Sequence, residues 1–242
     1  MYQNQFNSVQ RRRHPVRRFI TSLLFLGILL GVLGFIVYRA QNGTSVTVGP
    51  HPTVIINDCT GSVHVRAGSA NNQVILQQGW APFVFYSLDQ SSNTLTVDAC
   101  DLTIIVPPTT DVKISADTLI DILGVTGQFS LTSNGGSISL VQDTLTGQSS
   151  LDNNGGPITF QGALSPQTQT TFDENGGLID LTLPGNASFH LNVTGIQGTV
   201  TSEFPEVQAS QNDIHTNVGS SPSAQLTLSV NDTPIVLHKS TN

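Results

Sequence analysis

The clearest pattern in the chain is a block of alternating polar and apolar residues that occurs three times between residues 127 and 183. In each block an apolar residue precedes an Asn-Gly-Gly triplet, and an isoleucine and a second apolar residue follow it. The three blocks are Leu131, Asn134, Gly135, Gly136, Ile138 and Leu140; Leu151, Asn154, Gly155, Gly156, Ile158 and Phe160; and Phe172, Asn175, Gly176, Gly177, Ile179 and Leu181. The block recurs after 20 and then 21 residues, and a fixed period of this size is typical of a solenoid.

The Asn-Gly-Gly triplets predict the corners of this solenoid. Each coil must turn sharply between two short strands, and Asn and Gly adopt positive φ at the lowest cost. We therefore expect Ile138, Ile158 and Ile179 to stack in one line inside the molecule. The pattern weakens at both ends, where it predicts an upstream rung at Val112, Ile114, Ile120 and Ile122, a downstream rung at Phe189, Leu191, Val193 and Val200, and closing strands at residues 225–230 and 234–237.

The rest of the chain beyond residue 50 consists of short alternating runs separated by Gly, Asn, Asp and Pro, with no apolar stripe at helical spacing. Alternation with period two between turn residues is typical of half-buried strands. We predict an all-β domain over residues 51–242, built as a single stack of β-solenoid rungs of about 20 residues. Polar residues 39–50 are predicted to be a stalk that leads into the first strand.

The N-terminal part has a different character. Residues 1–18 contain five arginines and no acid, and Phe19–Tyr38 runs for twenty residues without a charge, enough for a helix of about 30 Å. A cleaved signal peptide is the alternative, but its apolar region is nearer to about 7 to 15 residues. We predict a basic cytoplasmic tail (1–18), a transmembrane helix (19–38) that anchors the chain in the cell membrane, and an extracytoplasmic C-terminal domain.

The exterior part is acidic. Beyond Arg39 three basic residues, Arg66, Lys113 and Lys239, stand against sixteen acids, a net charge of −13. Binding to nucleic acid or to anionic lipid depends on Lys and Arg that neutralise phosphates. This balance argues against both classes of ligand.

Cys59 and Cys100 are the two cysteines, and each precedes an apolar alternation. A disulfide between them would close about forty residues and contribute about 3–4 kcal/mol if it acts through chain entropy. An extracytoplasmic location permits this pairing. Two free buried thiols are the alternative, whereas a metal site would have too few obvious further ligands.

Several stretches together resemble one known family. They are the arginine cluster and apolar segment, Gly61-Ser-Val-His-Val65, the run from Leu102 to Asp111, the Asn-Gly-Gly-x-Ile rungs, and Leu183-Pro-Gly-Asn-Ala-Ser-Phe-His-Leu191. They resemble the bacterial DUF4097 family, whose members are named putative adhesins and carry a β-solenoid-like domain that is often membrane-anchored. The resemblance covers about residues 46–238 and rests on turns and strand alternation, so it implies a fold and brings no catalytic residues.

Candidate chemistry is sparse. Asp152, Asp173 and Glu174 occupy matching or adjacent places in successive rungs, where two carboxyls about 5–9 Å apart would act as an acid/base pair. No basic residue stands near them in the sequence, and solvated turns are the favoured interpretation. The histidines are scattered, so we predict no catalytic, cofactor or metal site.

An aromatic run contains Trp80 and Tyr86. Exposed, these side chains would stack on sugar rings or anchor a protein partner; buried, they would cap the open end of the stack, which is the favoured interpretation because an uncovered sheet end invites edge pairing. The leading functional hypothesis is a non-catalytic adhesin or surface-binding module for an envelope glycan or surface protein. An envelope scaffold or accessory of a stress-sensing system is the alternative, and a polysaccharide-cleaving enzyme is the remote one.

Overall fold

The structure is a computed structural model of the chain. It describes residues 23–35, 43–68, 72–78, 84–195, 199–208, 213–231 and 233–241. Residues 23–35 form a helix. Within the described residues, no helix has both the length and the apolar character that a membrane crossing requires. Residues 1–18 of the predicted tail, and residues 19–22 and 36–38 of the predicted membrane segment, lie outside the described part of the chain.

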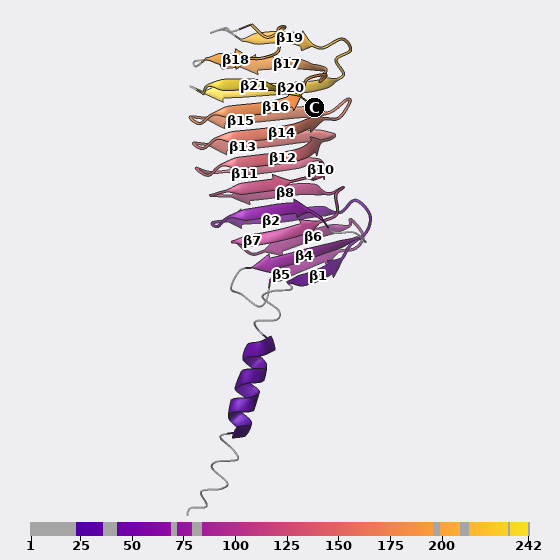
Figure 1. Cartoon of the computed structure of the whole chain (residues 1–242), viewed down its shortest axis with the longest axis vertical. Helices are drawn as coiled ribbons and strands as arrows, with labels where there is room; N and C mark the ends of the chain where they lie inside the picture. The colour runs from indigo at the N-terminus through magenta and orange to yellow at the C-terminus, as the bar shows by residue number, and fades with distance from the viewer. Residues whose placement is uncertain are drawn as a thin grey trace, which may run out of the picture.

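The other described elements are strands, and they form two open sheets (Figure 1). Sheet A has eleven strands in the order β1 (Thr44–Thr47), β4 (Gln73–Gln78), β7 (Leu102–Val106), β3 (Val63–Ala67), β9 (Ile120–Leu123), β12 (Ile138–Leu145), β14 (Ile158–Leu164), β16 (Ile179–Pro184), β21 (Ile235–Ser240) and β18 (Val200–Ser202), with β10 (Thr126–Gly127) beside β12. Sheet B has ten strands in the order β19 (Ile214–Val218), β17 (Phe189–Thr194), β20 (Ala224–Asn231), β15 (Gln169–Asn175), β13 (Gln148–Asn154), β11 (Phe129–Ser133), β8 (Asp111–Ala116), β2 (Thr53–Cys59), β6 (Thr94–Asp98) and β5 (Phe85–Asp89).

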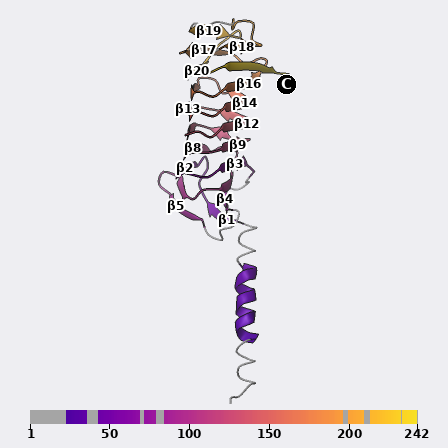
Figure 2. The same ribbon diagram turned by 90° about the vertical axis from the view of Figure 1, so that its left-hand side faces the viewer.

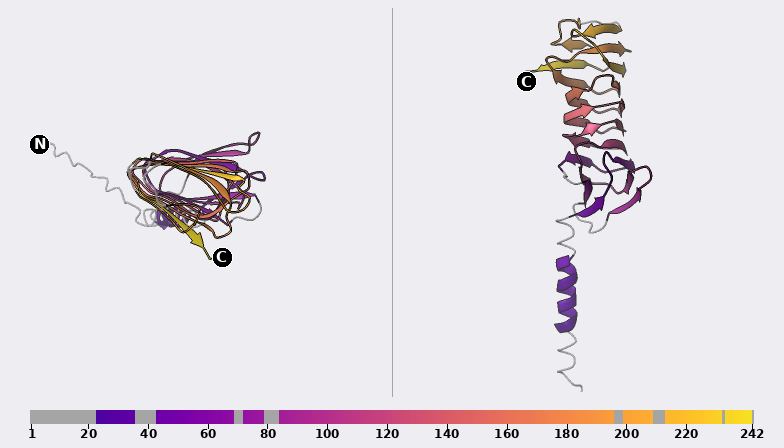
Figure 3. Two further views of the ribbon diagram at one scale, coloured as in Figure 1. Left: turned by 90° about the horizontal axis from the view of Figure 1, so that it is seen from above. Right: turned by 90° about the vertical axis from the view of Figure 1, so that its right-hand side faces the viewer.

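Each rung consists of one strand of sheet B, a corner, and one strand of sheet A, and successive rungs pair in parallel. Ile138, Ile158 and Ile179 are aligned with one another and fully buried, so the predicted internal line of isoleucines is confirmed. The upstream rung is confirmed as well, because β8 pairs with β11 and β9 pairs with β12 in the expected register. Viewed along the stack, the rungs overlie one another around a flattened core (Figure 3).

The two glycines of each corner have different tasks. The first glycine has a positive φ, 98° at Gly135 and 103° at Gly155, which L residues with a side chain rarely adopt. The second glycine packs backbone against backbone, since a Cβ at Gly156 would overlap the carbonyl oxygen of Gly136. Asn-Gly-Gly thus fixes both the turn and the close stacking of neighbouring corners.

The order of rungs at both ends differs from the order along the chain. The rung β2/β3 lies between β6/β7 and β8/β9, and the rung β20/β21 lies between β15/β16 and β17/β18. In Figure 1 the yellow C-terminal strands accordingly lie below the orange β17 and β18. The prediction that residues 225–237 close the sheet was therefore wrong. All rungs share the same alternation, so alternation alone carries no information about their order in space.

Antiparallel strands cover both ends of the stack (Figure 2). At one end β1 pairs with β4, and β5 pairs with β6; at the other, β19 pairs with β17. The predicted stalk, residues 39–50, is therefore in part a strand, because Val46 and Val48 alternate with polar residues and are buried. At the β19 end, Phe204 is buried and packs edge-on against Phe189, with ring centroids 5.6 Å apart.

Candidate functional site

A groove lies on the outer face of sheet B at the β19 end of the stack. Three strands, β20, β17 and β19, form its floor, and it has a volume of about 810 Å³. We call it the terminal groove. It is lined by His190, Leu191, Asn192, Glu206, His215, Thr216, Asn217, Gln225, Leu226 and Thr227.

The strand period places the polar side chains of the groove in two rows. Phe189, Leu191 and Val193 point into the core, so the alternate residues of β17 point outward. In one row His190 lies between Gln225 of β20 and Asn217 of β19; in the other, Asn192 lies between Thr227 and His215. The result is an array of six outward polar residues on three adjacent strands.

Some groups of the groove already have partners. His190 Nδ1 donates a hydrogen bond to Asn217 Oδ1 at 2.6 Å, since a carboxamide oxygen only accepts. Glu206 Oε1 accepts a hydrogen bond from the backbone NH of Gly219 at 3.3 Å. In contrast, Asn192 Oδ1 is shielded from solvent and accepts no hydrogen bond from the described residues. The side chains of His190, Asn217 and Glu206 are thus held in place by hydrogen bonds, and the side-chain oxygen of Asn192 is a buried acceptor without a donor among the described residues.

The groove carries one negatively charged side chain among its described lining residues. Among the described residues that line it, Glu206 is the one carboxylate, and Lys and Arg are absent. Hydrogen bonds from the backbone NH groups of Glu206 itself and of Gly219 lower the pKa of this carboxyl. The groove is therefore rich in neutral donors and acceptors and carries a negative charge at neutral pH.

Sequence reasoning did not find this site, although a signal was present. Strands β17 and β19 share a short motif, Phe189-His-Leu-Asn-Val193 and Ile214-His-Thr-Asn-Val218. Because the two strands are antiparallel, each histidine faces the asparagine of the other strand. The repeated His-x-Asn was the available signal, but its meaning depends on a pairing that the repeat of the rungs does not predict.

The predicted aromatic site lies at the opposite end of the stack. Tyr86 is 43% exposed and Phe85 is 75% exposed, and both belong to β5, the edge strand of sheet B. The cap interpretation is therefore wrong for Tyr86; Val46, Val74 and Leu76 are among the buried apolar residues of this end. Trp80 lies outside the described residues.

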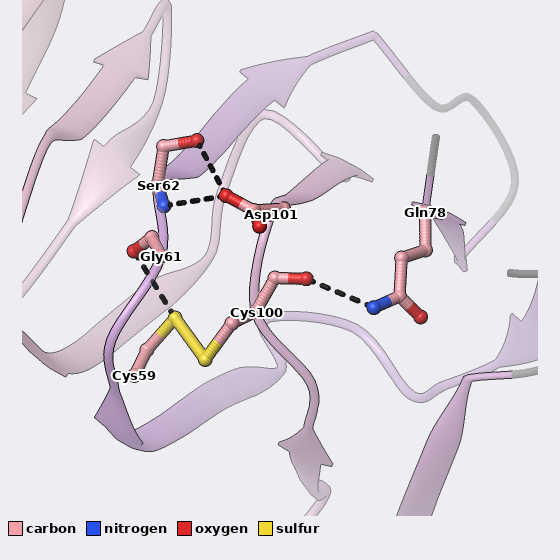
Figure 4. Close-up of a disulfide and its surroundings, with 6 residues drawn as sticks. All are labelled: Cys59, Gly61, Ser62, Gln78, Cys100 and Asp101. Atoms are coloured by element: carbon pink, nitrogen blue, oxygen red, sulfur yellow. Dashed lines mark hydrogen bonds between the residues drawn. A yellow bond between two sulfur atoms is a disulfide. The ribbon is translucent and has the colours of Figure 1, made fainter. Parts of the chain in front are cut away.

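Cys59 and Cys100 form a disulfide in the structure, with Cα atoms 5.3 Å apart (Figure 4). The bond joins the corners of two neighbouring rungs, β2/β3 and β6/β7. Around it, Asp101 Oδ1 accepts hydrogen bonds from the backbone NH and the hydroxyl of Ser62, and Gln78 Nε2 donates to the carbonyl oxygen of Cys100. The disulfide and these hydrogen bonds together hold the rung β2/β3 against its neighbour β6/β7.

The three candidate carboxylates do not converge. Asp152 and Asp173 are aligned neighbours on the outer face of sheet B, and burial followed by the charge of Asp173 raises the pKa of Asp152. Glu174 points the other way, into the corner, and is fully buried. None of the three lines the terminal groove, and the described residues contain no cluster of acids, histidines or cysteines suited to a metal ion.

The corner asparagines form a hydrogen-bonded ladder on the outside of the stack. Asn154 Nδ2 donates to Asn134 Oδ1 at 3.4 Å, Asn175 donates to Asn154 at 3.0 Å, and Asn231 donates to Asn175 at 2.8 Å. Asn231 is a fourth member of this ladder, and the Asn-Gly-Gly pattern does not predict it because Asp and Thr follow it instead of two glycines. The signal was its spacing to Pro234 and Ile235, which matches that from Asn154 to Pro157 and Ile158.

No protein-family model matches the chain, and no curated protein matches it. The DUF4097 resemblance therefore stays a prediction. Two solved structures are similar to the chain. One is a putative cell adhesion protein from Clostridium sporogenes (TM-score 0.42, 11% identity, covering 81% of this chain and 98% of that one), and the other is a putative adhesin from Bacteroides fragilis (TM-score 0.36, 11% identity, covering 80% and 95%). Since both TM-scores lie below 0.5, these likenesses carry no argument about function.

Proposed function

We propose that this chain is an adhesin-like, surface-binding β-solenoid, and that the terminal groove is its binding site. The observation that carries the proposal is the position of the groove. The stack begins with β1 and β5 at one end and finishes with β18 and β19 at the other, and the groove lies on the outer face of β17 and β19. A binding site is best presented at the end of a rigid stack that is farthest from its attachment.

In this proposal Phe19–Tyr38 attaches the chain to the cell membrane, the arginine-rich tail stays in the cytoplasm, and the sheets are extracytoplasmic. Strand β1, at Thr44, follows soon after Tyr38. The β1 end of the stack then lies next to the membrane and the groove faces away from it. Two features support this placement: the cysteine pair, which suits an oxidising compartment, and the acidic balance of the exterior part, which suits a site away from anionic lipid.

We propose binding without catalysis. The described residues that line the groove include no Lys or Arg to stabilise a developing negative charge. Asp173 and Asp152, the pair of acids that face the same side, lie two and three rungs away from β17, respectively, on the same sheet. Without a second carboxylate beside Glu206, an acid/base pair for glycoside cleavage is incomplete.

The test uses the full chain in proteoliposomes, with capture on surfaces coated with bacterial envelope fractions or extracellular matrix. The groove variant combines His190→Ala and Asn217→Ala, and its matched control combines Gln148→Ala and Gln169→Ala, exposed residues of lower rungs on the same face. We expect the wild type and the control to attach and the groove variant to lose attachment. Attachment to no coat, or equal attachment of the groove variant, would overturn the proposal.

A further inference from the structure

We propose that the terminal groove recognises a neutral oligosaccharide; this inference rests on the proposed function and names the ligand class of the same site. The first support is the chemistry of the array. Asn192, Asn217 and Gln225 each offer an amide that donates and accepts hydrogen bonds, and Thr227 adds a hydroxyl. A sugar ring likewise presents neighbouring hydroxyl groups that both donate and accept.

The spacing of the array suits a flat polyhydroxylated ligand. Neighbouring strands are about 4.8 Å apart, and outward residues of one strand are about 7 Å apart. Gln225, His190 and Asn217 follow one line across the three strands, and Thr227, Asn192 and His215 follow the next. A saccharide that lies across the strands meets one polar side chain at each step.

Charge selects among saccharides. The only charged lining group within the described residues is the Glu206 carboxylate, and a negative charge repels sulfate, phosphate and uronate groups at short range. Anionic glycans also need basic residues, which are absent from the described lining. The ligand is therefore neutral, and an anionic polymer of the same sugar serves as the discriminating probe.

The binding should be weak at a single site and strong in an array. No Phe, Tyr or Trp on which a sugar ring could stack is among the described lining residues, and the two leucines are nearly buried, with 2% and 1% exposure. Hydrogen bonds to an open groove compete with water and gain little each. Many anchored copies that meet a repeating polymer recover the affinity through multivalency.

The experiment measures attachment of proteoliposomes that carry the full chain to immobilised dextran, mannan, galactan and polymeric N-acetylglucosamine. Sulfated dextran and a uronate polymer are the anionic probes, a deacetylated glucosamine polymer is the amine-bearing probe, and protease-treated envelope coats are included. The decisive variant is Gln225→Ala. Its matched control is Gln169→Ala, which removes the exposed in-register glutamine one rung below, outside the groove.

We expect at least one neutral polymer to bind, the anionic polymers not to bind, and attachment to fall by about three- to tenfold in Gln225→Ala and not in Gln169→Ala. Asn217→Ala provides a second variant, since its exposed side chain is not needed for the core. Groove-dependent attachment only to protein coats that protease abolishes would overturn the glycan inference and leave the binding function standing. Stronger groove-dependent attachment to anionic or amine-bearing polymers would also overturn it. Failure of the proposed function would instead appear as the absence of groove-dependent attachment to every coat.

Discussion

Glu174→Gln should stabilise the fold at neutral pH. Inward side chains at successive corners follow a pattern: Ser133 Oγ and Asn153 Nδ2 each donate a hydrogen bond to a carbonyl oxygen of the preceding corner, at 2.9 and 3.1 Å. Glu174 occupies the next such position and is fully buried. A Cβ at Gly177 would touch both Glu174 Oε1 and Gly156 O, so the carboxyl lies beside the equivalent carbonyl oxygen. It fits the pattern only as a protonated donor.

The electrostatics agree with this geometry. Burial raises the pKa of Glu174 to about 7 from 4.5, and nearby hydrogen-bond donors, first the backbone NH of Gly177 and then the amide of Asn153, oppose the rise. The folded chain thus holds the proton more tightly than the unfolded chain. The contribution of Glu174 to the free energy of unfolding is therefore highest below pH 4.5, falls as the pH rises from about 4.5 to about 7, and is then level. The loss from this group is at most about 3 kcal/mol.

Glutamine has the same shape, stays neutral, and provides the NH₂ donor that Asn153 already uses one rung away. At pH 8 we expect Glu174→Gln to unfold at a higher denaturant concentration than the wild type, with a free energy of unfolding that is greater by up to about 3 kcal/mol. At pH 4 we expect the two proteins to have nearly the same free energy of unfolding. The measurement is guanidinium unfolding of the full chain in detergent, followed by circular dichroism. Asp143, whose pKa burial also raises to about 7, leaves part of the pH dependence in both proteins. A glutamine variant that is less stable at pH 8, or that keeps the full pH slope, would refute the reasoning.

Three further predictions concern the stack itself. Replacing Cys59 and Cys100 by serine should lower the free energy of unfolding by about 4 kcal/mol, because the disulfide spans 41 residues; reduction of the wild type should shift the unfolding midpoint equally, and an unchanged midpoint would contradict this. Asn154→Ala removes two ladder hydrogen bonds and should cost about 1–2 kcal/mol in the same assay. Gly156→Ala should cost more than about 3 kcal/mol because its Cβ meets backbone, whereas Gly68→Ala, whose Cβ would meet a side-chain methyl of Ile105 at 3.4 Å, should unfold nearly as the wild type does.

The local geometry of the central rungs could be predicted because it is encoded locally. The Asn-Gly-Gly corners and the isoleucines that follow them repeat at a fixed period, and both the turn and the buried face depend on residues within one rung. The prediction succeeded wherever each rung pairs with its immediate neighbour along the chain.

The order of the end rungs and the terminal groove could not be predicted, because both depend on pairings between strands that are far apart in the chain. Strand β15 pairs in parallel with β13 on one side and with β20 on the other. Strand β20 lies in the chain after both β17 and β19, and nothing in its alternation distinguishes it from another rung. The groove depends on this insertion, since Gln225 and Thr227 enter it from β20. Likewise, the sequence predicts a stalk where the structure has strand β1, because the two alternating residues Val46 and Val48 are too few to predict an edge strand.

The inserted end rungs also constrain how the protein acquires its fold. A stack of this kind is expected to grow one rung at a time from a nucleus, but β2/β3 and β20/β21 each need a partner on both sides. During synthesis β2/β3 must wait for two rungs made later, and β20/β21 follows β17, β18 and β19 in the chain yet lies between β15/β16 and β17/β18. The local pairings of residues 111–184 are therefore the natural place for folding to start. The rung β20/β21 then has to dock between two rungs that precede it in the chain, and until it does so β15 and β17 each lack the parallel partner that β20 provides.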